Sequence, residues 1–235
     1  MPDRYFSTRP IDGATVTLDG SEAHHLLHVM RAKPGLELTV FDGHGGEYAA
    51  EIAECKRSTV ELAVGKREEI ERELPFELTL AVALPKGDRQ RWLIEKCTEL
   101  GVTRLVPLQT ARSVSKVEKK EKLTRYVIEA SKQCGRNRLM KIAALTDWTA
   151  LLSTCTMGTR MIAHPQGEPI ARVETRRTEN EAIYIAIGPE GGFTDEEVAS
   201  TIESGWQHIG LGERILRIET AALALAAHFA IERRI

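Results

Sequence analysis

The sequence predicts an α/β protein in two parts, a small N-terminal β-barrel and a larger C-terminal domain built on a parallel sheet. Residues 14 to 65 alternate short strand-like runs with Gly and Asp turns, as in a small barrel. Beyond Pro75, strand-like and helix-like segments alternate, which is typical of a parallel sheet with helices on its faces. The charged stretch REEIERELP (67–75) separates the two patterns. We therefore expect domains at 1–70 and 71–235.

In the N-terminal part we expect four strands and one short helix. The strands are ATVTL, LELTVF, EYAAEIA and STVELAV. The helix is SEAHHLLHVMRA, with Ser21 as its N-cap and a Pro-Gly pair beyond its end. Leu26, Leu27 and Met30 are expected on its apolar side.

In the C-terminal part the expected strands are FELTLAVAL, RLVPLQ, GTRMIAH, AIYIAIG and WQHIGLG. GTRMIAH and AIYIAIG are almost uninterrupted apolar runs, as expected of central parallel strands buried on both faces. DRQRWLIEKCTEL is an expected helix that Asp88 caps and Gly101 ends, and a longer helix runs from about Glu118 to Cys134. The closing helix, TAALALAAHFAIERR, is apolar nearly all round, so it is expected to be buried in the domain or against a second subunit.

Composition narrows the class of protein. The 235 residues are 42% hydrophobic and 28% charged, without an apolar stretch near the roughly 20 residues that a membrane span needs and without an N-terminal signal pattern. We therefore expect a cytoplasmic protein. The four cysteines are spread too widely for a CxxC site, and we expect reduced thiols that hold no metal.

Positive charge is concentrated in one stretch. Between Arg112 and Lys141 there are ten basic residues and three acids, a net of +7, although the whole chain has a net charge of −2. A solvated helix face rich in lysine would explain this, and so would a surface that follows a phosphate backbone.

Two glycine-rich strand ends indicate a ligand site. IGPEGGF (187–193) stands between an expected strand and a helix, whose start carries the capping box Thr194–Glu197. Backbone N–H groups and the helix dipole converge there, although the glycines could simply allow positive φ. GLGERILRIETA (210–221) follows the next strand, and adjacent strand ends of an open α/β sheet point to one crevice.

The position of these motifs limits the ligand. Only 23 residues follow Gly212, too few for a Rossmann fingerprint and its acidic partner, and no Walker sequence occurs. Glu190 stands between the glycines and would repel a phosphate. A neutral or cationic ligand fits better, and the sulfonium of S-adenosylmethionine (SAM) is a candidate.

The chain resembles the RsmE family, the 16S ribosomal RNA uridine-N3 methyltransferases of the SPOUT superfamily. The resemblance rests on IGPEGGF and LGERILRIETA together with KGDRQRWLIEKCTELGV (86–102), ARSV (111–114) and EASKQCGRNR (129–138). RYF (4–6), HHLLHVMR (24–31) and FDGHGGEY (41–48) are similar to that family's PUA-like RNA-binding barrel. The match covers nearly the whole chain; Cys134 and Met140 depart from it, away from the glycine motifs.

The resemblance implies a trefoil-knotted SPOUT domain at 71–235, an exception to the rule that chains avoid knots, and a PUA-like barrel at 1–70. It implies SAM as cofactor, 16S rRNA within the small ribosomal subunit as substrate, and a homodimer whose interface includes the closing helix and the knot. The cofactor contacts that it implies are Ala163, His164, Gly188, Glu190, Gly191, Gly192, Leu211, Gly212, Ile215 and Leu216.

Methylation at N3 of uracil requires an unpaired or flipped base and the loss of the N3 proton. A cation near O2 or O4 would stabilise the anion that forms. Arg136 and Arg112 are the first candidates and Arg217 the next, and each could instead be a phosphate contact or a surface ion pair. Glu190 could accept the proton, or it could make a cap contact to the following helix.

The expected RNA contacts are Arg4, Arg9, Arg31, Lys86, Arg89, Arg112, Lys116, Arg136 and Arg138. We expect His164 to pack under the cofactor, and His24, His25 and His28 to be core or RNA contacts rather than metal ligands. Trp92, Trp148 and Trp206 are expected in the core. A SPOUT methylase for another base or position is one alternative, and a non-catalytic RNA-binding protein with this fold is the other.

Overall fold

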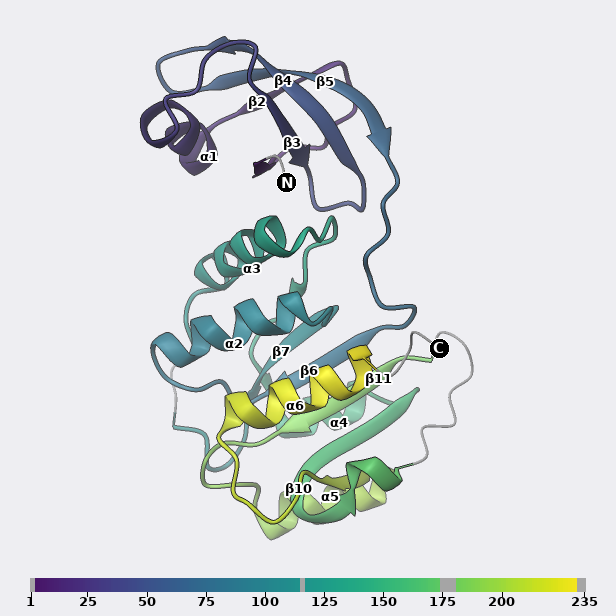
Figure 1. Ribbon diagram of the computed structural model, residues 1–235. Helices are drawn as coiled ribbons and strands as arrows, with labels where there is room; N and C mark the ends of the chain where they lie inside the picture. The colour runs from purple at the N-terminus through teal and green to yellow at the C-terminus, as the bar shows by residue number, and fades with distance from the viewer. Residues whose placement is uncertain (1–2, 115–116, 174–180, 232–235) are drawn as a thin grey trace. The chain divides into compact units, whose positions relative to one another are not determined.

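The computed structural model describes residues 3–114, 117–173 and 181–231, and the chain divides into two compact units (Figure 1). One unit consists of Met1–Glu73 with Ile128–Leu139, and the other of Leu74–Val127 with Met140–Ile235. Residues 128–139 belong to the first unit by their contacts, so the division is not a single cut along the chain. None of the helices within the described ranges is both long and apolar enough to cross a membrane.

The first unit is built on a curled five-stranded sheet. Its strands are β1 (Arg4–Phe6), β2 (Thr15–Leu18), β3 (Glu37–Phe41), β4 (Glu47–Cys55) and β5 (Val60–Glu68), in the spatial order β1-β3-β4-β5-β2. The pairing of β1 with β3 is parallel and the other three pairings are antiparallel. The four expected strands are confirmed. β1 is an addition that was too short to show a period-2 pattern.

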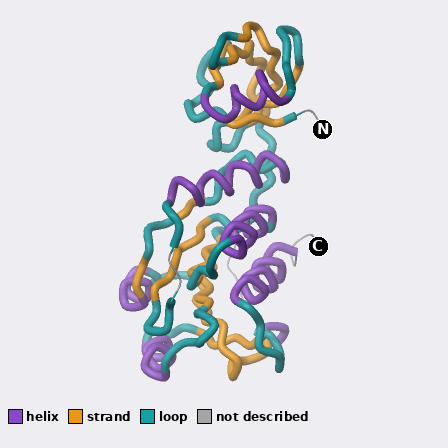
Figure 2. The backbone as a smooth tube through the Cα atoms, turned by 90° about the vertical axis from the view of Figure 1, so that its left-hand side faces the viewer, coloured by secondary structure: helices purple, strands orange, loops and turns teal. Residues whose placement is uncertain are grey.

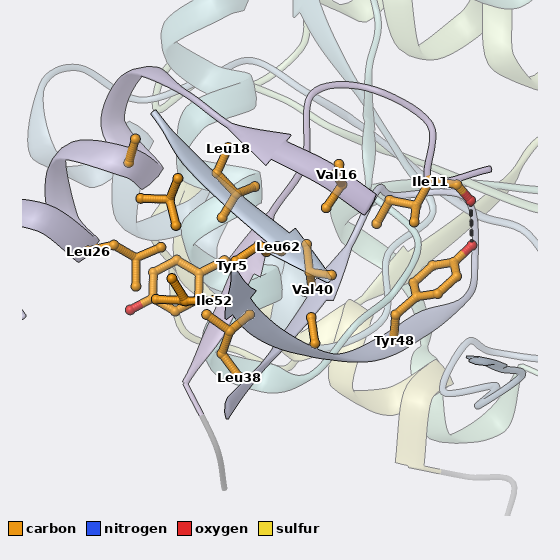
Figure 3. Packing of buried hydrophobic residues seen from close by; sticks show 13 residues of the cluster. Tyr5, Ile11, Val16, Leu18, Leu26, Leu38, Val40, Tyr48, Ile52 and Leu62 are labelled. Carbon is orange, nitrogen blue, oxygen red and sulfur yellow. Dashed lines mark hydrogen bonds between the residues drawn. The ribbon is translucent and has the colours of Figure 1, made fainter. Parts of the chain in front are cut away.

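Alternate residues of these strands fill the core of the first unit (Figure 3). Leu38 and Val40 of β3, Ile52 of β4 and Leu62 of β5 are almost fully buried. Because successive side chains of a strand point to opposite faces, one face of the sheet packs inward and the other faces solvent. The Tyr48 hydroxyl also donates a hydrogen bond to the Ile11 carbonyl at 2.9 Å.

The expected helix of the first unit is shorter and less regular than its sequence indicates. α1 (Gly20–His24) passes into a π-helical turn (His25–Val29), and its N-cap is Asp19 rather than the expected Ser21. Leu26 is fully buried, whereas Met30 is 44% exposed, so the expectation for Met30 is wrong. The wider π turn explains this, because it rotates the following residue out of an α-helical face.

The second unit has an all-parallel sheet, as expected of the α/β class. Its strands are β6 (Leu78–Val82), β7 (Arg104–Gln109), β8 (Lys141–Ile142), β9 (Thr146–Asp147), β10 (Thr159–Pro169), β11 (Ile183–Ile187) and β12 (Gln207–Gly210). The order is β12-β10-β11-β6-β7-β8, and β9 also pairs with β7. All of these pairings are parallel. β6, β10 and β11 are central, in agreement with their apolar runs.

Helices cover both faces of this sheet (Figures 1 and 2). α2 (Asp88–Glu99) and α6 (Ile218–Ile231) pack together on one face. α4 (Trp148–Thr154) and α5 (Asp195–Glu203) lie on the other, where Trp148 and Trp206 are buried as expected. α3 (Lys120–Cys134) runs into the segment that belongs to the first unit, and a 3-10 turn (Ile170–Arg172) follows β10.

Two expectations for α2 are wrong. Trp92 is 45% exposed on the helix surface rather than buried in the core. Asp88 is the first helical residue and not the N-cap, which is Gly87 with a φ of +62°. The positive φ at the N-cap favours glycine, and glycine has no side chain that could accept a hydrogen bond from the first helical N–H groups. The expected end of the helix at Gly101 is confirmed, since Gly101 has a φ of +82° directly after the C-cap.

Candidate functional site

The glycine turn, residues 188–193, follows β11 and forms one wall of a cavity in the second unit. Gly192 N donates to the Pro189 carbonyl at 2.8 Å, and Gly192 has a φ of +69°. Glycine is required at this position by the backbone, because other residues rarely adopt that conformation. The expected capping box follows: Thr194 Oγ1 accepts from Glu197 N at 3.2 Å, and Glu197 Oε2 accepts from Thr194 N at 2.9 Å.

The second loop, residues 211–217, follows β12 and forms another wall. Gly212 has a φ of +95°, and a Cβ added there would meet nothing within 4 Å. This glycine is therefore needed for its conformation and not for space. Ile215 is 97% exposed, which is unusual for a large apolar side chain at a cavity. An exposed apolar side chain in this position is suited to contact with a ligand.

A bulge in β10 supplies the third wall. Ile209 of β12 pairs with Ala163 and again with Glu168, so residues 164–167 bulge out between the two pairings. The bulge places His164 and Pro165 at the cavity. It also brings Gly167 so close to β12 that a Cβ would lie 2.5 Å from the backbone C and N of Ile209. Only glycine fits at this crossing.

The cavity has a volume of about 320 Å³, which lies within the range of small-molecule sites. It lies at the carboxyl ends of parallel strands, as expected of an α/β sheet. The structure brings together all ten residues that the resemblance assigns to a cofactor: Ala163, His164, Gly188, Glu190, Gly191, Gly192, Leu211, Gly212, Ile215 and Leu216. Their assignment to a cofactor stays a prediction.

Arg112 lines the same cavity and holds the glycine turn. Its Nη1 donates to the Gly191 carbonyl at 2.8 Å and to the Phe193 carbonyl at 3.2 Å. The neighbouring Ala111 N donates to Glu197 Oε1 at 2.8 Å. The segment after β7 is therefore attached to the glycine turn through two hydrogen bonds and to the first turn of α5 through a third. A cation at the cavity was expected from the sequence. The hydrogen bonds that this cation donates to the glycine turn were not expected.

Glu190 does not make the expected alternative contact, a cap to the following helix. Thr194 and Glu197 provide that cap. The Glu190 carboxylate is 48% exposed, and its Oε1 lies 3.4 Å from Arg89 Nη1. Glu190 thus lines the cavity with its carboxylate in an ion pair.

Arg136 does not line the cavity. It belongs to the first unit, where its side chain is only 4% exposed and forms a two-pronged ion pair with Glu73, with Nε to Oε1 at 2.9 Å. A buried guanidinium that is engaged by a carboxylate in this way is suited to stabilising the fold. The cavity therefore gives no support to a catalytic or RNA-binding role for Arg136. Arg217, the third candidate, is exposed and does not line the cavity either.

The expected RNA contacts differ in exposure. Arg4 is only 8% exposed, and it binds Glu47 Oε2 at 2.5 Å and Asn137 Oδ1 at 2.6 Å. Burial alone would raise the pKa of Glu47, but hydrogen bonds from Arg72 and Arg4 hold that pKa below its usual range. The Arg4 guanidinium is therefore buried in this hydrogen-bond network and is not accessible to an RNA phosphate.

Five of the remaining expected RNA contacts are accessible to a nucleic acid. Arg9 is 69% exposed and Arg138 is 52% exposed. Arg31, Lys86 and Arg112 are also exposed. Lys116 lies outside the described residues. Arg89 is engaged with carboxylates of the second unit.

His164 has a second histidine beside it. The His164 and His208 rings are 5.9 Å apart between centroids, and His208 Nε2 lies 2.7 Å from Thr201 Oγ1. The Thr201 hydroxyl donates its single proton to the Val198 carbonyl at 2.6 Å, so His208 Nε2 is the donor in that pair. Burial lowers the pKa of His208, and the neighbouring His164 lowers it further.

Sequence reasoning missed two residues, one in the cavity wall and one outside the lining, in the first turn of α6. Phe193 lines the cavity and packs on Trp148 at 4.8 Å between ring centroids. Glu219, in the first turn of α6, has a side chain that is only 8% exposed and lies 3.7 Å from Arg89. The signal for Glu219 was present, because it is the one acid in the LRIETAALALAAHFA run.

Comparison with known proteins gives the class of this fold and site. A profile of the RNA methyltransferase domain matches residues 72–230, and a profile of the RNA methyltransferase PUA domain matches residues 18–64. The cavity in the parallel-sheet unit and the curled sheet before it are thus those of an RNA methyltransferase with a PUA domain. The expected fold class is confirmed.

Relatives narrow the class to one family. The ribosomal RNA small subunit methyltransferase E of Bacillus subtilis is 33% identical, over 92% of this chain and 90% of its own length. The Synechocystis protein of the same name is 36% identical, over 91% and 72%. The chain belongs to the ribosomal RNA small subunit methyltransferase E family, as the resemblance predicted.

Two solved structures share the fold and carry a ligand. One is a ribosomal RNA small subunit methyltransferase E from Neisseria gonorrhoeae bound to S-adenosyl methionine, with a TM-score of 0.88, 30% identity and coverage of 98% of this chain and 97% of that chain. The other, from Legionella pneumophila, is in complex with the bound cofactor SAM, with a TM-score of 0.90, 28% identity and 98% coverage of both chains.

Proposed function

We propose that the protein transfers the methyl group of SAM to N3 of a specific uridine in 16S ribosomal RNA, in the decoding region of the small subunit. The observation that carries this proposal is the cavity at the carboxyl ends of the parallel strands, lined by all ten residues that the family resemblance assigns to the cofactor. Membership of the ribosomal RNA small subunit methyltransferase E family supports the reaction class.

The residues present fit SAM. Backbone of the glycine turn and the second loop lines the cavity, so amides and carbonyls are available to bind an adenine edge. Ile187, Ile209 and Leu216 supply apolar surface around it. Glu190 suits a cationic ligand better than an anionic one. When bound, SAM supplies an electrophilic methyl group on a positively charged sulfur.

The chain's own contribution is to hold the reacting groups in place. The glycine turn, the second loop and the β10 bulge are three separate walls, each fixed by backbone geometry that only glycine permits. Holding a donor and an acceptor at near-attack distance can lower a barrier by roughly 7–11 kcal/mol. The rigid positioning of these walls is therefore the main catalytic device that we propose.

Arg112 is the cation that we propose for the developing charge on uracil. Its Nη1 is fixed to the glycine turn, while Nε and Nη2 have no hydrogen-bond partner among the described residues. These N–H groups can bind O2 or O4 of the base as the N3 proton leaves. Glu190 is a wall residue in this proposal, because its carboxylate is paired with Arg89. Arg136 has a structural role.

The RNA would bind along the basic stretch and the PUA unit. Lys119, Lys120, Lys122 and Arg125 are all exposed on α3 or directly before it. Exposed lysines and arginines displace counterions from phosphates, which supplies most of the sequence-independent affinity for RNA. We further propose a cytoplasmic homodimer that includes α6 in its interface and acts on the assembled small subunit. The domains that the family resemblance implies, a PUA-like barrel at 1–70 and a trefoil-knotted domain at 71–235, are part of the same proposal.

Calorimetric titration with SAM tests the cofactor. The wild-type protein is expected to bind SAM with a stoichiometry of about one per chain. The control Gly13→Ala is expected to bind SAM equally well, because a Cβ at Gly13 would meet nothing within 4 Å. Absence of binding at millimolar SAM would contradict the proposal and would favour a non-catalytic RNA-binding protein.

A further inference from the structure

One arginine behind the cavity contacts both of its glycine-bearing walls. Arg89 is in the first turn of α2, and its Nη1 lies 3.4 Å from Glu190 Oε1 and 3.7 Å from Glu219 Oε1. Glu190 belongs to the glycine turn. Glu219 is in the first turn of α6, directly after the second loop. A single guanidinium therefore connects two segments that are 29 residues apart in the sequence (219 − 190).

Glu219 shows that this contact is more than a surface ion pair. Its side chain is 8% exposed, and its Oε2 is buried without a hydrogen-bond partner among the described residues. A carboxylate is costly to bury unless a cation or several donors face it. The helix dipole favours an acid in the first turn of α6, but an exposed carboxylate would interact with the dipole equally well. The dipole therefore does not explain why Glu219 is buried. The ion-pair partner that the structure gives to Glu219 is Arg89.

Arg89 and Glu219 lie outside the lining of the cavity. Ile218 and Ala221, on either side of Glu219 along α6, both line it. Glu190 also lines the cavity. Displacement of Arg89 would release Glu190 on one wall and leave a buried charge at the base of the other. The same geometry argues against the RNA contact expected for Arg89, because two carboxylates already face its charge.

We infer that Arg89 is a positioning residue, which fixes the glycine turn against the first turn of α6 through Glu190 and Glu219 and thereby sets the affinity for the cofactor. This inference rests on the proposed function, because the cofactor is SAM. Arg89 does not line the cavity. Its effect is on the distance between two walls, so it is expected in the Kd and KM for SAM and not in kcat at saturating SAM.

Five variants separate positioning from charge neutralisation. Arg89→Gln is expected to weaken SAM binding about fivefold, as for a partly exposed charge pair, and to lower the Tm because Glu219 loses its cation. The double variant Arg89→Gln with Glu219→Gln removes the buried charge, so its Tm recovers while its SAM affinity stays as weak as that of Arg89→Gln. Glu190→Gln is expected to weaken SAM binding through its own place in the cavity wall, and the loss in Arg89→Gln with Glu190→Gln is expected to be smaller than the sum of the two single losses, because Arg89 acts partly through Glu190. Arg91→Gln is the control, since Arg91 pairs with Glu95 on the same helix, away from the cavity.

Three results would overturn the inference. The first is recovery of SAM affinity together with the Tm in the Arg89–Glu219 double variant, because Arg89 would then only neutralise Glu219. The second is additive losses for Arg89 and Glu190. The third is a rise in KM for RNA with an unchanged Kd for SAM, as a phosphate contact would give. Failure of the wild-type protein to bind SAM would instead reject the proposed function.

Discussion

Arg112 connects the end of β7 to the glycine turn through one guanidinium nitrogen, which donates to the carbonyls of Gly191 and Phe193. Hydrogen bonds from a charged donor are worth more than neutral ones, and two of them fix the plane of the guanidinium. Its other N–H groups then have a defined direction at the cavity. Arg112 therefore both shapes the wall and orients a charge.

Substitution of Arg112 should affect binding and chemistry together. Arg112→Gln is expected to raise the Kd for SAM and to lower kcat by about a hundredfold, because a donor to the developing uracil anion is lost. Arg112→Lys keeps the charge but not the planar fork, so an intermediate kcat is expected. Calorimetry and single-turnover methylation measure the two effects. If Arg112→Gln retained wild-type kcat, the charge-stabilising role would be wrong.

The sequence could predict which residues meet at the cavity, because glycine motifs that follow parallel strands of one sheet lie at the same edge of it. The expectation that the two strands are adjacent was wrong, since β10 lies between β11 and β12. The sequence could not predict which arginines are engaged. Arg136 and Arg4 are equivalent to exposed arginines by residue type, yet their partners Glu73 and Glu47 lie 63 and 43 positions away in the chain. Such pairings depend on tertiary packing, which a single sequence does not display.

Among the elements, β10 has the most demanding geometry. Its bulge makes Ile209 of β12 the partner of both Ala163 and Glu168, and Gly167 and Gly210 approach each other closely there. The sequence indicated a strand ending at His164, since the pattern loses its apolar run at that point. The structure extends the strand to Pro169 through the bulge. A bulge has no period of its own, so the hydrophobic pattern could not reveal it.

Gly167→Ala tests this crossing. The added Cβ would lie 2.5 Å from backbone atoms of Ile209, so the substitution should lower the free energy of unfolding by about 1–3 kcal/mol or more. Urea unfolding measures the loss. Gly13→Ala, which meets nothing within 4 Å, is expected to be neutral or slightly stabilising. Equal stability of the two variants would contradict the close approach.

The β10–β12 pair should also respond to pH through His208. Because burial and then His164 lower its folded pKa, the unfolded chain binds this proton more readily. The stability that neutral His208 contributes is therefore present above its unfolded pKa of about 6.5, and it is lost as the pH falls from there through the folded pKa.

His208→Gln removes this titration. Urea unfolding at pH 7.5 and 5.5, values on either side of the unfolded pKa of about 6.5, should show a larger drop in stability for the wild type than for the variant. The difference between the two drops isolates His208 from the carboxylates that titrate in both proteins. An equal drop in the two proteins would show that His208 is not held neutral in the folded state.

At the scale of the whole molecule, the two parts were predictable because their hydrophobic periods differ, period 2 with turns before residue 67 and strand-helix alternation after Pro75. The contribution of residues 128–139 to the first unit was not predictable. Lys132 pairs with Glu22 at 2.9 Å, and Arg72 donates to the Gly135 carbonyl at 2.9 Å. α3 therefore supplies its last residues to the barrel unit, although it begins in the other unit.

The central claim is methylation of 16S rRNA at N3 of uridine, and nucleoside mass spectrometry tests it most directly. Small subunits from a strain that lacks the gene are incubated with the purified protein and SAM, and the 16S rRNA is then digested to nucleosides. The account predicts that 3-methyluridine is absent before incubation and rises to about one per 16S rRNA afterwards. Absence of new 3-methyluridine, or appearance of the methyl group on another base or position, would contradict it.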